Sequence, residues 1–200
     1  LDDNTLRAWN GHPARFIIDN SDDFEEKISK AIQAIYHVVG RPYKAPDKKK
    51  YLIKMPAVDV LNKYNAVPVN MMQTYLTSSD PTVERRIRQQ ENGSEHLYFY
   101  TDKHTTRDGV YVTEKPISLK DYAARLMESD LSLRSVKKCK YSFIYKEHRL
   151  AVDVYPFCDD KAILFVYDKG GEIPEDFEII REVTDNPEYK NRRLAAMQSL

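Results

Sequence analysis

The stretch "VKKCKYSFIYKEHRLAVDVYPF", residues 136–157, contains two β-prone segments separated by a short polar turn. β-branched and aromatic residues recur through 136–145 and 149–157, which is typical of strands. Lys138 and Lys140 share one face of the first segment because side chains alternate along a strand. Asp153 is an acid inside the second, mostly apolar segment. The stretch therefore predicts two strands that carry ionisable side chains within them.

Short β-prone segments separated by polar turns recur through most of the chain. Asn92-Gly93 and Asp108-Gly109 are strong hairpin signals between such segments. The further strands are predicted at 50–56, 69–76, 83–90, 96–103, 109–115 and 161–168, and helices at 118–129, 174–182 and 187–198. Eight strands with hairpin links predict an α+β fold: an eight-stranded antiparallel β-barrel, closed so that no edge is exposed, with flanking helices.

Cations recur on one face of several predicted strands. The pairs are Lys48 with Lys50, Arg86 with Arg88, and Lys138 with Lys140, and Lys103 shares a face with Thr101 and Phe99. In a closed barrel each strand sends one face into the lumen, so these cations either line the lumen or form a solvated outer face. The lumen interpretation needs an apolar outer face. Ile87, Val152, Val154, Ile163 and Val166 are the residues that could supply it.

Composition excludes several classes of protein. The formal net charge of the 200 residues is +0, which excludes a uniformly basic nucleic-acid binder but not a local basic site. Two cysteines are too few for a disulfide framework, which favours a cytoplasmic or other reducing compartment. No apolar run approaches the roughly 20 residues that span a bilayer, and no signal peptide is present.

The first 41 residues have a different character. Residues 15–19 predict a short strand, and Asp22 with Glu25 forms a plausible capping box for the helix that follows. Apolar residues then recur at helical spacing from Phe24 to Val39. A strand and an amphipathic helix are half of an α/β unit, so we expect the apolar stripe to pack against the barrel or a second copy. Residues 42–49 predict a linker.

Seven stretches in order resemble the CYTH family, the triphosphate tunnel metalloenzymes. They are "KKKYLIKMP", "MMQTYL" followed by "VERRIR", "LYFYTDK", "VYVTEKPIS", the 136–157 stretch, "KAILFVYD" and "REVTDNPEYKN", which together cover residues 48–197. The resemblance implies an eight-stranded antiparallel barrel whose lumen is a tunnel. It further implies that basic residues in the tunnel grip a triphosphate, while carboxylates bind a divalent metal for its hydrolysis.

The resemblance also assigns roles to residues. It implies that the phosphate-binding residues are Lys48, Lys50, Arg86, Arg88, Lys103, Lys138 and Lys140. It implies Glu114 and Asp153 as the remaining catalytic and metal-binding acids, for Mg²⁺ or Mn²⁺ if the chain is active. The family's other acid positions fall on Pro46, Lys48, Val112, Ala151, Phe165 and Tyr167. Because the basic set is kept and the acid set is depleted, the pattern favours anion binding without a cofactor over metal-dependent hydrolysis.

Residues 1–41 resemble the tail of the P-loop nucleotide-binding domain that precedes CYTH in one two-domain branch. That branch includes eukaryotic proteins similar to the fly translocation-defect protein, associated with GTP and phosphoinositide binding. The chain contains no G-x-x-x-x-G-K-[ST] motif. We therefore expect domains at 1–41, a linker at 42–49 and a tunnel domain at 50–200, with the missing nucleotide-binding domain as a partner in cis.

Four functions stay open on the sequence. The first is a binder of a phosphorylated anion: a triphosphate, nucleotide, polyphosphate or phosphoinositide head group. The second is a divalent-metal tripolyphosphatase or nucleoside triphosphatase using Glu114, Asp153 and Glu84. The third is a binder of RNA 5′-triphosphate ends. The fourth is a scaffold whose barrel serves as an interaction surface.

Overall fold

A computed structural model describes residues 16, 18, 24–92, 94–146, 148–167 and 171–200. Contacts divide the chain into two compact units. Unit 1 contains Pro46–Met72 and Arg134–Leu200, together with Leu1–Pro13, which lies outside the described residues. Unit 2 contains Ala14–Ala45 and Gln73–Leu133. Strand β3 (Val67–Leu76) runs from one unit into the other, and the predicted domain division at residues 41 and 49 stays a prediction.

Unit 1 is built on five antiparallel strands in the order β7-β8-β9-β2-β10. Their bounds are Val136–Tyr145 (β7), His148–Val154 (β8), Lys161–Val166 (β9), Lys49–Lys54 (β2) and Ile179–Glu182 (β10). One face of this sheet holds the core, which also takes Leu61 from α3 (Val58–Lys63) and Phe177. The unit ends in a 3₁₀ turn (Pro187–Tyr189) and α5 (Asn191–Met197).

The register of unit 1 separates apolar and ionisable residues. Val152 and Leu164 are paired and point into the core. Asp153 pairs with Lys140 on one side and with Ile163 on the other, so these three side chains share the opposite face. Val152, Val154 and Val166 therefore lie on the apolar face as predicted. Ile163 was assigned to that face wrongly, because its pairing with Asp153 places it among the ionisable residues.

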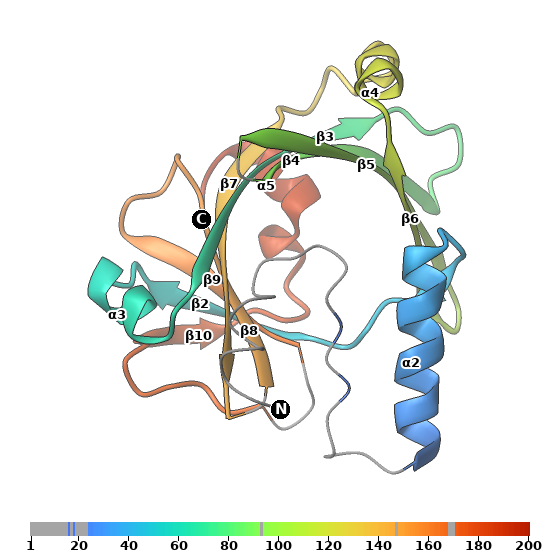
Figure 1. The fold of residues 1–200 in the computed structure, drawn as a ribbon. Helices are drawn as coiled ribbons and strands as arrows, with labels where there is room; N and C mark the ends of the chain where they lie inside the picture. The colour runs from blue at the N-terminus through green and yellow to red at the C-terminus, as the bar shows by residue number, and fades with distance from the viewer. Residues whose placement is uncertain (1–15, 17, 19–23, 93, 147, 168–170) are drawn as a thin grey trace. The chain divides into compact units, whose positions relative to one another are not determined.

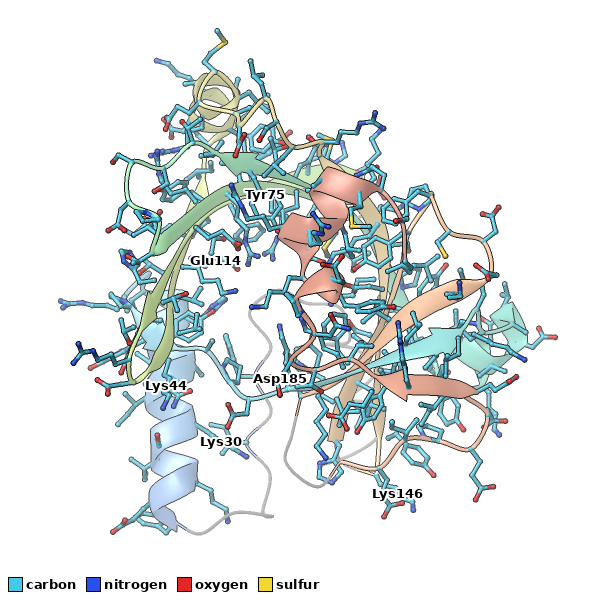
Figure 2. The ribbon with its side chains drawn as sticks, turned by 180° about the vertical axis from the view of Figure 1, so that it is seen from behind. Lys30, Lys44, Tyr75, Glu114, Lys146 and Asp185 are labelled. Carbon is cyan, nitrogen blue, oxygen red and sulfur yellow. The ribbon has the colours of Figure 1, made fainter. Side chains whose placement is uncertain are left out.

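Unit 2 is built on strands in the order β1-β6-β5-β4, also antiparallel. Their bounds are Tyr43–Lys44 (β1), Gly109–Ile117 (β6), Glu95–Thr106 (β5) and Val83–Asn92 (β4). Helix α4 (Leu119–Leu126) covers one face, where its Tyr122 packs with Leu76 and Ile87. Figure 2 shows Glu114 of β6 on the side of the sheet away from α4. The other face of unit 2 is thus the one that can carry a site.

Helix α2 (Phe24–Val38) confirms the helix predicted after residue 22. It contacts β1 and β6 and lies beside β6 in Figure 1. Its predicted apolar stripe is not packed among the described residues: Phe24 is 76% and Ile35 58% exposed. Asp22 of the expected capping box, and most of the strand predicted at 15–19, lie outside the described residues.

The eight predicted strands are all present, with helix α4 where 118–129 predicted it. Two strands were missed. β1 lies in the stretch read as a linker, and β10 lies in the segment read as a helix at 174–182, where Ile179 pairs with Ile53. The strand order has two ends, β1 and β10. For the described residues, the predicted closed eight-stranded barrel is therefore corrected to ten strands in an open antiparallel sheet.

Two smaller differences concern helices. Helix α3 was not predicted, and the helix predicted at 187–198 is divided into a 3₁₀ turn and α5. Asn186 caps that turn by accepting a hydrogen bond from Glu188 N, and Pro187 occupies the first turn. Within the described part of the chain, no helix has the length and apolar character needed to cross a membrane.

Candidate anion-binding site

The centre of the site in unit 1 is a buried carboxylate between two lysines. Asp153 of β8 has no exposed surface. Both lysines lie on β7, where Lys140 pairs directly with Asp153 across the β7–β8 ladder. Lys138 Nζ lies 2.5 Å from Asp153 Oδ2, and Lys140 Nζ lies 2.8 Å from Oδ1. The side chain of Lys138 is only 5% exposed, whereas that of Lys140 is 20% exposed. Lys140 is thus the partner with access to a ligand.

The ionisation of this triad follows from its surroundings. Burial alone would raise the pKa of Asp153, but attraction to Lys138 and Lys140 has the larger effect and lowers the pKa to about 2. Burial likewise lowers the pKa of Lys140, yet Asp153 and Tyr167 raise it above its ordinary value. The carboxylate of Asp153 and the ammonium group of Lys140 are therefore charged at neutral pH. One carboxylate is shared by two lysines.

Two aromatic rings gather further lysines next to this triad. Phe165 and Tyr167 are stacked, with ring centroids 6.1 Å apart and an angle of 21° between the planes. The ammonium groups over the Phe165 ring belong to Lys140 at 4.8 Å, Lys48 at 5.4 Å and Lys50 at 5.9 Å from the centroid. Lys140 Nζ also donates a hydrogen bond to the Tyr167 hydroxyl at 3.2 Å. These are cation–π distances, at which a ring attracts a cation without cancelling its charge.

Two hydrogen bonds to the segment after β10 position Lys50. The Lys50 N–H donates to Thr184 Oγ1 at 3.0 Å, and its carbonyl accepts from the Val183 N–H at 2.8 Å. Arg149 of β8 lies over the Tyr167 ring with its guanidinium carbon 4.0 Å from the centroid. We call Lys48, Lys50, Lys138, Lys140 and Arg149 the basic cluster of unit 1. Arg149 was not predicted, although it falls on the same strand face as Asp153 by alternation.

A second group of ionisable residues lies on β4, β5 and β6 of unit 2. The register aligns Arg86, Thr101 and Glu114 in one row across the three strands. Glu114 is 8% exposed. It accepts hydrogen bonds from Arg88 Nη2 at 3.1 Å and from Thr101 Oγ1 at 3.0 Å. The alternation predicted from the sequence thus places both arginines on the face of Glu114.

The arginines of this row differ in their partners. Arg88 stacks on Phe99, with 4.5 Å from the guanidinium carbon to the ring centroid. Its Nε is buried and has no hydrogen-bond partner within the part of the chain that the structure describes. Arg86 Nη1 lies 4.0 Å from Glu84 Oε1, and Lys103 pairs with Glu84 across the β4–β5 ladder. Glu84 therefore lies among cations.

Helix α2 adds a residue that sequence reasoning missed. His37 Nε2 lies 3.9 Å from Glu114 Oε1, and its Nδ1 lies 3.0 Å from the Tyr43 hydroxyl on β1. The five histidines show no metal-ligand spacing in the sequence, so no signal marked this one. Burial alone would raise the pKa of Glu114. The charges of Arg88, Arg86 and His37 together outweigh burial, so the pKa lies below its ordinary value.

The predicted site residues thus fall into two groups. Unit 1 brings together Lys48, Lys50, Lys138, Lys140 and Asp153. Unit 2 brings together Glu84, Arg86, Arg88 and Glu114, with Lys103 in register beside them. That all of these cations line one lumen stays a prediction.

The two acids do not form a good site for Mg²⁺ or Mn²⁺. These ions take several oxygen ligands in near-octahedral geometry. Asp153 is held by two lysines, and Glu114 is held by Arg88 and Thr101. Among the described residues, no group of three or more His, Cys, Asp or Glu side chains is placed to hold a metal ion. In the part of the chain that the structure describes, both acids are therefore already engaged by neighbouring side chains.

The fold and the site define an antiparallel α+β protein with basic clusters on one face of its strands. Among solved structures it is similar to the protein NE1496, described once as a hypothetical protein and once as an inorganic triphosphatase. The identities are 24% and 23%, with TM-scores of 0.51 in both. The matches cover 76% and 78% of this chain, and 97% and 95% of the other.

A conserved hypothetical protein from Pyrococcus furiosus is also similar, at 17% identity and a TM-score of 0.44, over 62% of this chain and 81% of that one. No protein-family model matches the chain, and no curated protein does. At these identities the likeness to NE1496 shows the fold. It confirms the predicted class, an antiparallel α+β sheet with flanking helices.

Proposed function

We propose that the chain binds a polyphosphate anion through the basic cluster of unit 1, without a divalent metal. The observation that carries this proposal is that two lysines flank the buried carboxylate of Asp153, and that Lys48, Lys50 and Arg149 join them over the neighbouring rings of Phe165 and Tyr167. Ammonium groups brought this close repel one another, and the repulsion falls when an anion binds between them. Each charge-assisted contact to phosphate contributes about 1.5–3 kcal/mol.

The arginines of unit 2 are proposed as further phosphate-binding residues. A guanidinium has five N–H donors in a planar fork, which suits bidentate contact with phosphate oxygens. Arg88 uses one nitrogen for Glu114, and its stacking on Phe99 fixes the plane of the fork. This arrangement supports a role for Arg86 and Arg88 in anion binding.

We further propose that efficient metal-dependent hydrolysis is absent. Such hydrolysis needs a metal to orient water and to offset charge on the leaving phosphate. The two acids available for it, Glu114 and Asp153, are engaged by basic side chains. The competing function is an active triphosphatase using these acids and Glu84. The description of NE1496 as an inorganic triphosphatase favours it, and both functions share a triphosphate ligand.

The order of the seven stretches and the likeness to NE1496 support membership of the CYTH family as a proposal. A preceding P-loop domain, a relation to the fly translocation-defect branch, and phosphoinositide or RNA 5′-triphosphate ligands stay predictions. The phosphoinositide and RNA ligands have the same chemistry as the proposed ligand, because each presents clustered phosphate oxygens to the cations. The triphosphate is therefore the probe of choice.

Calorimetric titration with tripolyphosphate in EDTA should show saturable binding, and the ligand should raise the melting temperature by mass action. GTP, inositol phosphates and triphosphorylated RNA titrated in parallel would rank the sources of phosphate. A suitable control is Lys49→Ala, because Lys49 is exposed and alternates away from Lys50 on β2; it should bind as the wild type does. Absence of binding of all four probes in EDTA would contradict the proposal.

A further inference from the structure

We propose that the stacked pair Phe165 and Tyr167 makes the site selective for the metal-free polyphosphate anion over its magnesium complex. The two rings act as positioning residues, because they hold the cations that meet the anion. The inference rests on the proposed anion-binding function and concerns the same site. Two neutral side chains thereby determine whether the site prefers the metal-free or the metal-bound anion.

The geometry singles out these rings. Three lysine ammonium groups lie within 5.9 Å of the Phe165 centroid, and two of them, from Lys48 and Lys140, lie within 5.9 Å of the Tyr167 centroid. The lysines come from β7, from β2 and from the residue before β2, so the rings are the feature these cations share.

The sheet register fixes Phe165 in this role. Phe165 pairs with Lys50 on one side and with Ala151 on the other, and it is 6% exposed. Ala151 has only a methyl group, so the neighbouring strand leaves room for a large ring on this face. A ring held in this way keeps its face toward the ammonium groups.

The physical consequence lies in the charge that remains. A carboxylate at either ring position would also attract the lysines, but it would neutralise them and offer oxygen ligands to Mg²⁺. The π face attracts cations through its quadrupole and adds no negative charge and no oxygen ligand next to them. Mg²⁺ bound to a polyphosphate lowers the negative charge of the ligand and is itself repelled by the lysines. The bare anion is therefore the preferred ligand.

Titrations with tripolyphosphate alone and with saturating Mg²⁺ test this selectivity. For the wild type we expect affinity about tenfold or more lower with Mg²⁺. Phe165→Leu and Tyr167→Leu keep apolar bulk but remove the rings, and each should weaken binding of the free anion by about three- to tenfold. Tyr167→Phe keeps the ring and should stay close to the wild type. Phe165→Glu should reverse the order, so that Mg²⁺ strengthens binding.

The outcomes separate this inference from the function on which it rests. If Lys50→Ala and Lys140→Ala leave the affinity for tripolyphosphate unchanged, the proposed function itself fails. If those two variants weaken binding while both leucine variants keep the wild-type preference for the metal-free anion over its magnesium complex, only the role of the rings is refuted. The leucine variants decide the matter even if Phe165→Glu does not fold, and thermal unfolding monitors all of them.

Discussion

Replacing Asp153 with Ala should lower the free energy of unfolding by about 3–5 kcal/mol, as expected when one partner of a buried ion pair is removed. The carboxylate has no exposed surface, and it forms ion pairs with Lys138 and Lys140. Without it, the amine of Lys138 has lost this counter-charge in a position where its side chain is only 5% exposed. Urea unfolding at pH 7 measures the effect.

The matched control is Asp159→Ala, because Asp159 is an exposed aspartate of the same unit and its loss should change stability little. Tripolyphosphate should stabilise the Asp153→Ala variant more than the wild type, because the anion replaces the missing negative charge. A loss below about 1 kcal/mol would show that Asp153 is not the counter-charge that holds the two lysines.

The same residue predicts a dependence on pH. The pKa of Asp153 is depressed from 3.8 to about 2 in the folded chain. A depressed carboxyl pKa stabilises the fold above the unfolded value and loses that contribution as pH falls through the folded value. About 2 kcal/mol of stability should therefore disappear between about pH 4 and pH 2. Asp153→Asn should lack this part of the acid dependence.

Replacing Lys140 with Ala should weaken tripolyphosphate binding by about ten- to a hundredfold, the equivalent of one charge-assisted phosphate contact. Lys140 is the more accessible of the two lysines bound to Asp153, and it also lies over Phe165. Its loss removes a contact to the anion and leaves Asp153 with one counter-charge fewer. Isothermal titration in EDTA gives the affinity.

Lys137→Ala is the control for this variant. Lys137 is exposed on the same strand, and alternation turns it away from Lys138. It removes one positive charge from the chain without touching the cluster. Equal losses in Lys137→Ala and Lys140→Ala would mean that tripolyphosphate responds to overall charge rather than to a built site.

Much of the fold could be predicted because the strands carry a two-residue alternation and hairpin turns. The shared face of Lys138 and Lys140 on β7 is an example, because alternation predicted it and both side chains contact Asp153 on the face opposite to the core. Strand β10 could not be predicted in this way. Phe177 and Ile180 have helical spacing, and the strand forms because β2 offers unpaired backbone groups, with Lys54 N–H donating to the Glu178 carbonyl.

The sequence named most of the cations of the candidate site, but it did not indicate the side chains that surround them. The resemblance placed two acid positions of the family on Phe165 and Tyr167, and the contact of these rings with the lysines depends on ring positions that only the register defines. His37 was missed because it reaches Glu114 only after α2 packs beside β6. The burial of Lys138 likewise depends on the strands on either side of it.

The most direct test of the central claim is phosphate release from tripolyphosphate with Mn²⁺, measured alongside binding in EDTA. We predict tight binding that EDTA leaves unchanged, and no phosphate release above a heat-denatured control. Glu114→Gln should bind equally or more tightly, because it removes a negative charge next to Arg88. Mn²⁺-dependent release that disappears in Glu114→Gln, with binding that collapses in EDTA, would contradict the account and establish Glu114 and Asp153 as a working metal site.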